Sequence, residues 1–181
     1  MRIFGIDPGS HRTGYGCVET EGSRHRVVVT GAISTPASAS FTEKLLAIHQ
    51  RLSVLIVDCH PDTVAVEGVF HSLNVQSALK LGHARGVAML AAVQAGVPVV
   101  EYTPAEVKRA VVGYGRAEKH QVQQMVRLIL GLDAVPTPHD AADALAVAIC
   151  HLHSCSPLAP SGRSRSKAAT SWRHFRLPAR P

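Results

Sequence analysis

The sequence contains no apolar run long enough to cross a membrane. Its 181 residues are 46% hydrophobic, which is enough to bury the core of one domain of ordinary size. None of its apolar runs approaches the roughly 18 residues of a membrane-spanning helix. The first residues lead directly into a predicted strand and not into a signal peptide. We therefore expect a cytoplasmic protein with no membrane partner.

Paired cysteines are also absent. The spacing of the cysteines is not typical of a disulfide framework, and free thiols in or near the core are expected in a reducing compartment. The segment 150–155, Cys-His-Leu-His-Ser-Cys, matches no standard zinc-binding pattern, so no zinc site is predicted there. The four cysteines are Cys17, Cys59, Cys150 and Cys155.

Acidic residues are missing from the C-terminal segment. Residues 157–181 contain no acid but hold six of the 19 basic residues, so the remaining chain has 13 basic residues (19 minus 6) against 13 acids. The net charge of +6 is thus a property of this segment and does not by itself argue for nucleic-acid binding by the rest. Its Pro, Ser, Gly and Arg content predicts a disordered basic tail, 157–181, after a single domain, 1–156.

Within that domain, positive charge gathers in residues 108–127, where Glu118 is the only acid. Such local clustering is typical of contacts to a phosphate backbone. An ordinary solvated helix face is the alternative. The five basic residues, which we call the basic cluster, are Lys108, Arg109, Arg116, Lys119 and Arg127.

Hydrophobic periodicity and helix-end signals predict three strands, then alternating helices and strands, then helices. This order indicates an α/β domain with a mixed five-stranded sheet flanked by helices. The expected strands are 3–6, 14–18, 26–33, 63–67 and 97–102. The expected helices are about 40–60, 74–95, 104–111 and 118–130, with a last helix opening at 137–140.

Two of these strands end on carboxylates, Asp7 before Pro8-Gly9 and Glu67 before Gly68. If the two strands are adjacent and parallel, with a helix as the crossover, both acids lie at the same edge of the sheet. Asp7 could instead merely cap its Pro-Gly turn through its own backbone.

Two further acids, Asp140 and Asp143, lie three residues apart at the start of the last helix and project from one face. Asp140 could serve only as a cap at the third helical position. Asp143 interrupts an apolar run, where a carboxylate is costly unless it is paired or binds a cation. Four oxygen donors suit Mg²⁺ or Mn²⁺. Because Mg²⁺ usually takes one or two protein carboxylates, four imply two ions bridged by a substrate phosphate, as in a phosphodiesterase.

The helix at 74–95 carries a stripe of small residues, Ala78, Gly82 and Gly86. Such a stripe permits close approach of another backbone. The domain's own sheet and a second subunit are both possible neighbours.

The order and length of these motifs resemble RuvC-type crossover junction endodeoxyribonucleases, the Holliday junction resolvases of bacteria. The resemblance covers residues 1 to about 153. The segments that carry it are Ile6-Asp7-Pro8-Gly9-Ser10 with Thr13-Gly14-Tyr15-Gly16, Glu67 with Phe70, 78–86, 107–113, 117–119 and 140–145.

This resemblance implies a ribonuclease H-like fold for the domain 1–156 and a homodimer. It also implies Mg²⁺-dependent symmetric nicking of four-way DNA junctions in recombination and repair. Two ions per site are expected, with Mn²⁺ as a substitute, and the RuvA-RuvB branch-migration complex is the expected partner.

Residue by residue, the resemblance makes Asp7, Glu67, Asp140 and Asp143 metal-binding catalytic carboxylates. Phe70 would stack on an unpaired base at the crossover, although a core residue on a loop is the alternative. Lys108 and Lys119 would lie near the scissile phosphate, with Lys119 catalytic. Arg109 and Arg116 would join them in binding DNA.

Other families share parts of the pattern. The Asp-Pro-Gly-Ser turn also resembles the first phosphate loop of actin-like ATPases, which need a second lobe and another glycine-rich phosphate motif that this sequence does not contain. A YqgF-type ribonuclease H-like nuclease acting on RNA stays an alternative. So does a non-catalytic junction-binding protein, although four acids beside DNA would oppose binding alone.

Overall fold

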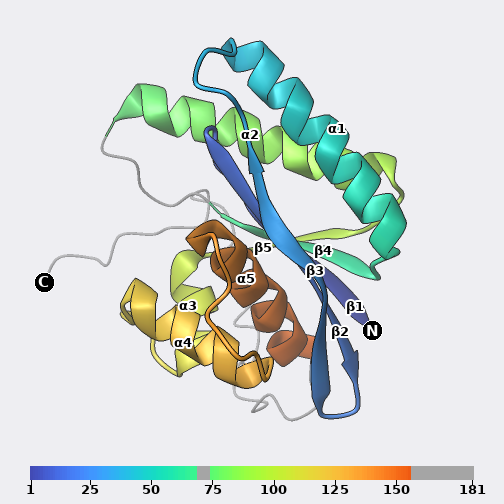
Figure 1. Ribbon diagram of the computed structural model, residues 1–181, viewed down its shortest axis with the longest axis vertical. Coiled ribbons are helices and arrows are strands. Elements are labelled where there is room, and N and C mark those ends of the chain that lie inside the picture. The colour runs from blue at the N-terminus through green and yellow to red at the C-terminus, as the bar shows by residue number, and fades with distance from the viewer. Residues whose placement is uncertain (69–73, 156–181) are drawn as a thin grey trace, which may run out of the picture.

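The computed structural model describes residues 1–68 and 74–155, in which five strands and five helices follow one another in the predicted order (Figure 1). The strands are β1 (Arg2–Asp7), β2 (Arg12–Glu21), β3 (Arg24–Ser34), β4 (Thr63–Glu67) and β5 (Val99–Tyr102). The helices are α1 (Phe41–Cys59), α2 (Val75–Gln94), α3 (Pro104–Val112), α4 (Lys119–Ile129) and α5 (His139–Cys155).

The strands form one mixed sheet in the order β3-β2-β1-β4-β5. β1, β2 and β3 are an antiparallel meander, whereas β4 runs parallel to both β1 and β5. α1 is the crossover from the meander to β4. The predicted five-stranded mixed sheet is confirmed. The two strands that end on acids, β1 and β4, are parallel neighbours, which is the condition under which both acids lie at one edge of the sheet.

Helices cover both faces of this sheet, α1 and α2 on one and α3, α4 and α5 on the other (Figure 1). Successive strand residues point to opposite faces. Phe4 and Ile6 accordingly join the core under α1 and α2, whereas Ile3 and Ala65 join the core with α5. Asp7 and Glu67 share the parity of Ile3 and Ala65, so both acids face α5.

α5 lies directly on the sheet because three glycines underneath it leave room. A Cβ on Gly5 would lie 2.0 Å from the Ala144 carbonyl oxygen, and one on Gly14 would lie 1.9 Å from that of Asp140. Gly16 likewise faces Leu145, at 2.6 Å from its nearest atom. At Gly5 and Gly14 the short contact is with the helix backbone, so a side chain at either position would require the helix to move. These two glycines therefore fix the height of α5 above β1 and β2.

Helix ends follow the sequence signals where the caps are local. Both predicted capping boxes are present, Ser40 with Glu43 at α1 and Thr103 with Glu106 at α3. β2 and β3 are longer than predicted, because their ladder continues from the apolar centre to the pair Glu21 and Arg24. Because the side chains at this end of the hairpin are polar and solvated, hydrophobic periodicity does not reveal that the strands continue.

The small-residue stripe of α2 does not pack on the domain's own sheet. The buried face of α2 consists of Ala84, Ala88, Ala91 and Ala92. A Cβ on Gly82 or Gly86 would meet nothing within 4 Å. The possibility that the stripe faces the sheet is therefore wrong.

Other sequence expectations concern thiols and membranes. All four cysteines are free; Cys155 is exposed and the other three are buried. Among the helices of the described residues, none combines the length and apolarity that a membrane crossing requires. The proposed tail begins within the segment 156–181, which lies outside the described residues.

Candidate active site

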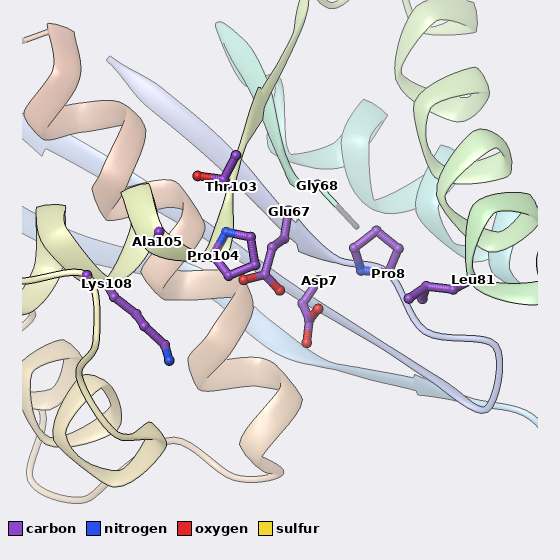
Figure 2. Close-up of a pocket in the computed structure, with 10 residues that line it drawn as sticks. Asp7, Pro8, Glu67, Gly68, Leu81, Thr103, Pro104, Ala105 and Lys108 are labelled. Carbon is purple, nitrogen blue, oxygen red and sulfur yellow. The ribbon is translucent and has the colours of Figure 1, made fainter. Parts of the chain in front are cut away.

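Asp7 and Glu67 end neighbouring parallel strands and form the floor of a cleft. Their strands pair with Ile6 opposite Val66, so the next residue on each strand is one of the two acids. Figure 2 shows both carboxyl groups projecting into the same pocket. The two carboxyl groups are close enough to share a hydrogen bond.

Asp140 and Asp143 reach the same place from the first turns of α5. The helix begins at His139, so Asp140 is its second residue and not the third, as the sequence suggested. The Asp143 Oδ2 lies 2.6 Å from the Lys119 Nζ of α4, and the Asp140 Oδ2 lies 3.5 Å from the Arg12 Nη1 of β2. Each α5 carboxylate therefore has its own cation.

Burial and the neighbouring carboxyl groups shift the titration of Asp7, Glu67 and Asp143. Burial, the charges of Glu67 and Asp143, and the hydrogen bond to Glu67 raise the pKa of Asp7 to about 8. Burial also raises the pKa of Glu67 and of Asp143, although the Lys119 ammonium partly offsets the latter shift. Burial lowers the pKa of Lys119, but the ion pair with Asp143 outweighs it and the net shift is upward. Ionising Asp7, Glu67 and Asp143 together requires additional positive charge.

The chemistry of this donor set fits a divalent cation. Four carboxyl groups at one sheet edge supply only oxygen donors, which hard cations prefer. No group of three or more His, Cys, Asp or Glu side chains within residues 1–68 and 74–155 already has the arrangement of a metal site. Lys119 and Arg12 engage the α5 carboxylates instead, so a cation would have to replace these ion pairs.

The cleft continues into two cavities that both have Glu67 in their walls. The larger, about 600 Å³, is lined by Asp7, Glu67, Leu81 of α2 and Lys108 of α3, among others (Figure 2). The smaller, about 220 Å³, brings Glu67 and Lys108 together with Lys119 and Asp143. Both lysines predicted to lie near a phosphate are therefore beside the acids.

The remaining predicted residues are less closely tied to the cleft. Arg109 on α3 and Arg116 after it are exposed. Arg127 points elsewhere, because its Nη1 donates to the Asp133 carbonyl. Phe70 lies outside the described residues.

Arg12 is the residue of this site that the sequence analysis missed. It precedes Gly14 by two positions on β2 and therefore shares the face on which Gly14 contacts α5. The alternation of side chains along β2 identifies Arg12 as a residue of this face once Gly14 is known to lie under α5. Arg12 stands apart from the basic cluster, so charge clustering along the sequence does not single it out.

The family model that matches this chain and the two relatives described here indicate the same family. Residues 3–151 match the family model described as crossover junction endodeoxyribonuclease RuvC. The crossover junction endodeoxyribonuclease RuvC of Pelobacter propionicus is 53% identical over 176 residues, which cover 97% of this chain and 99% of that protein. That of Chloroflexus aggregans is 52% identical over 164 residues, 91% of this chain and all of that protein.

A solved structure agrees with these relatives. Thermus thermophilus RuvC in complex with Holliday junction substrate is 39% identical, covers 85% of this chain and 94% of that one, and superimposes with a TM-score of 0.81. This likeness, with the sheet order described above, confirms the ribonuclease H-like fold.

Proposed function

Since the chain belongs to the RuvC family of crossover junction endodeoxyribonucleases, we propose that it resolves four-way (Holliday) DNA junctions by symmetric, metal-dependent nicking during homologous recombination and repair. The observation that carries the proposal is the meeting of Asp7, Glu67, Asp140 and Asp143 beside two lysines at one sheet edge. Thermus thermophilus RuvC, its relative, has been solved with such a junction.

These four acids are the proposed ligands of Mg²⁺. Two ions held there, for which Mn²⁺ would substitute, would supply Lewis-acid charge at the phosphate and lower the pKa of the attacking water. The raised pKa of Asp7 supports this assignment, because a buried acid crowded by other acids releases its proton readily only when a cation compensates it.

The chemistry proposed is hydrolysis by direct displacement. Water attacks the phosphorus in line, the bond to the 3′ oxygen breaks, and the products are a 3′-hydroxyl and a 5′-phosphate. Lys119, held 2.6 Å from Asp143, offsets negative charge on the scissile phosphate, and Lys108 faces the same cavity. Asp7 must lose its proton before it can bind a cation. No covalent intermediate with the protein is required.

Junction binding is assigned to the basic cluster and to Phe70. Lys108, Arg109, Arg116 and Lys119 would contact phosphates without reading sequence, so affinity should fall steeply with salt. Phe70 would stack on a base at the opened crossover, a contact worth about 1–3 kcal/mol.

Symmetric cutting requires two active sites, so the working form is a homodimer whose twofold axis matches the junction. We place the dimer contact at the exposed stripe of Gly82 and Gly86 on α2, where nothing of the described chain fills the space. Cooperation with the RuvA-RuvB branch-migration complex in the cytoplasm completes the proposal.

The test is cleavage of end-labelled four-way junctions by the purified protein, with linear duplex of the same sequence as control. We expect paired nicks in opposite strands of the junction with Mg²⁺, ligatable products, and no cleavage in EDTA. Equal cleavage of the duplex, or intact junctions with Mg²⁺, would refute the assignment. A parallel reaction with structured RNA tests the alternative of an RNA nuclease.

A further inference from the structure

Arg12 stands at the edge of the active site without a role in the proposed chemistry. It begins β2, pairs with Ser34 of β3, and points to the α5 face of the sheet. Its side chain is 51% exposed, and its Nη1 lies 3.5 Å from the Asp140 Oδ2. It is thus anchored at the cleft while much of the side chain remains open to solvent.

The position of Arg12 is opposite that of the basic cluster. Asp143 pairs with Lys119 of α4, whereas Asp140, one helical turn away, pairs with Arg12 of β2. In Figure 1, α5 lies between α3 and α4 on one side and the β2–β3 hairpin on the other. Cations therefore approach the α5 carboxylates from both sides, but the basic cluster provides only one of them.

We propose that Arg12 is a phosphate-contact residue for the junction strand, on the wall of the cleft opposite the basic cluster, and that Asp140 holds it there until DNA binds. The proposal rests on the proposed function and extends it by one residue. A strand that crosses the cleft to bring its scissile phosphate to the acids has phosphates on both sides of that point. The basic cluster can contact only those on the α3–α4 side.

The chemistry of the pair suits an exchange of partners. An exposed, single ion pair at this distance contributes little to stability, so breaking it costs little. The planar guanidinium matches a phosphate with two parallel hydrogen bonds. Moving Arg12 to a phosphate would also leave Asp140 free to bind a cation. Arg12 would then pair with a phosphate, and Asp140 with a cation.

Junction affinity in EDTA tests the contact without cleavage, using Arg12→Gln over a range of salt concentrations. We expect about three- to tenfold weaker binding and a slope of log affinity against log salt that is shallower by about 1. Arg51→Gln is the matched control, because Arg51 is an exposed arginine on α1, across the sheet. It should bind as the wild type does.

Calorimetric titration of the free protein with Mn²⁺ separates this role from a merely structural one. Arg12→Gln should bind Mn²⁺ more tightly, because Asp140 loses a competing cation. If Mn²⁺ binding changes while junction affinity and salt slope stay at wild-type values, Arg12 is only a partner of Asp140 and the proposal is overturned. A wild-type protein that does not prefer junctions to duplex overturns the proposed function itself, and this proposal with it.

Discussion

Asp7 owes its pKa of about 8 to burial and to Glu67 and Asp143 around it. In the unfolded chain an aspartate titrates near 3.9. Between about pH 4 and pH 8 the folded protein therefore holds a proton that the unfolded chain has released. Since stability falls with pH wherever the native state binds more protons, the cation-free fold loses stability as pH rises through this window.

Asp7→Asn should accordingly stabilise the cation-free protein at pH 8. The amide keeps the shape of the side chain and removes a charge that the cluster disfavours. We expect a gain of about 1 kcal/mol or more, seen as a rise of roughly 2–4 °C in Tm for each kcal/mol. Thermal unfolding in EDTA measures it, and the gain should vanish near pH 4. A variant less stable than wild type at pH 8 would show that the acids are not in conflict.

How far the sequence predicts single residues depends on what determines their position. Asp7 and Glu67 were predictable because each ends a buried strand, and Asp143 because it interrupts an apolar run. The pairing of Asp140 with Arg12 was not, because it depends on the height of α5 above β2. That height is a property of tertiary packing and leaves no local pattern in the sequence.

At the scale of elements, the contact of α5 with the sheet decides whether two of the four acids reach the cleft. Gly14 lies under the Asp140 carbonyl, and Gly5 under that of Ala144. The helix backbone therefore rests directly on the strand that ends in Asp7. Register and close approach together position the site.

Gly14→Ala should displace the start of α5. Its Cβ would lie 1.9 Å from the Asp140 carbonyl oxygen, so the helix must shift, and overpacking of this kind costs about 1–3 kcal/mol or more. We expect a lower Tm and at least tenfold slower junction cleavage under conditions where the variant is fully folded. Gln50→Ala is the control, because Gln50 is an exposed residue of α1 on the other face of the sheet and alanine favours a helix. Wild-type cleavage by a folded Gly14→Ala protein would contradict the packing argument.

Gly82→Leu tests the dimer contact proposed for α2. The monomer has open space at this position, so the fold should tolerate leucine and the unfolding transition should be preserved. A bulky side chain in a close helix contact should weaken association, which sedimentation equilibrium measures. An unaltered dimer would place the contact elsewhere.

At the scale of the whole molecule, the net charge comes from a different part of the chain than the fold. Residues 1–156 carry no net charge, so junction affinity of the domain must come from local clusters. The fold was largely predictable, because strand and helix signals were strong and the parallel pairing of β1 and β4 follows from the α1 crossover. The dimer and the tail stay predictions, since neither depends on contacts within the domain.

Removal of residues 157–181 should leave the Tm of the domain and its cleavage of saturating junction unchanged. The six basic residues lost should reduce affinity at low salt and make its salt dependence shallower. Binding isotherms of full-length and truncated protein at two salt concentrations measure this. Identical isotherms would make the tail a passive appendage.

The central claim is that the acids of the two strand ends and of α5 act as one cation-dependent site. Single-turnover cleavage of a four-way junction with Mg²⁺, by wild type, Asp7→Asn and Asp143→Asn at matched occupancy, tests it most directly. We predict that both variants bind the junction at least as tightly as wild type in EDTA, because negative charge is removed, and that each cuts at least about a hundredfold more slowly. Cleavage by either variant at a rate comparable to wild type would contradict the claim.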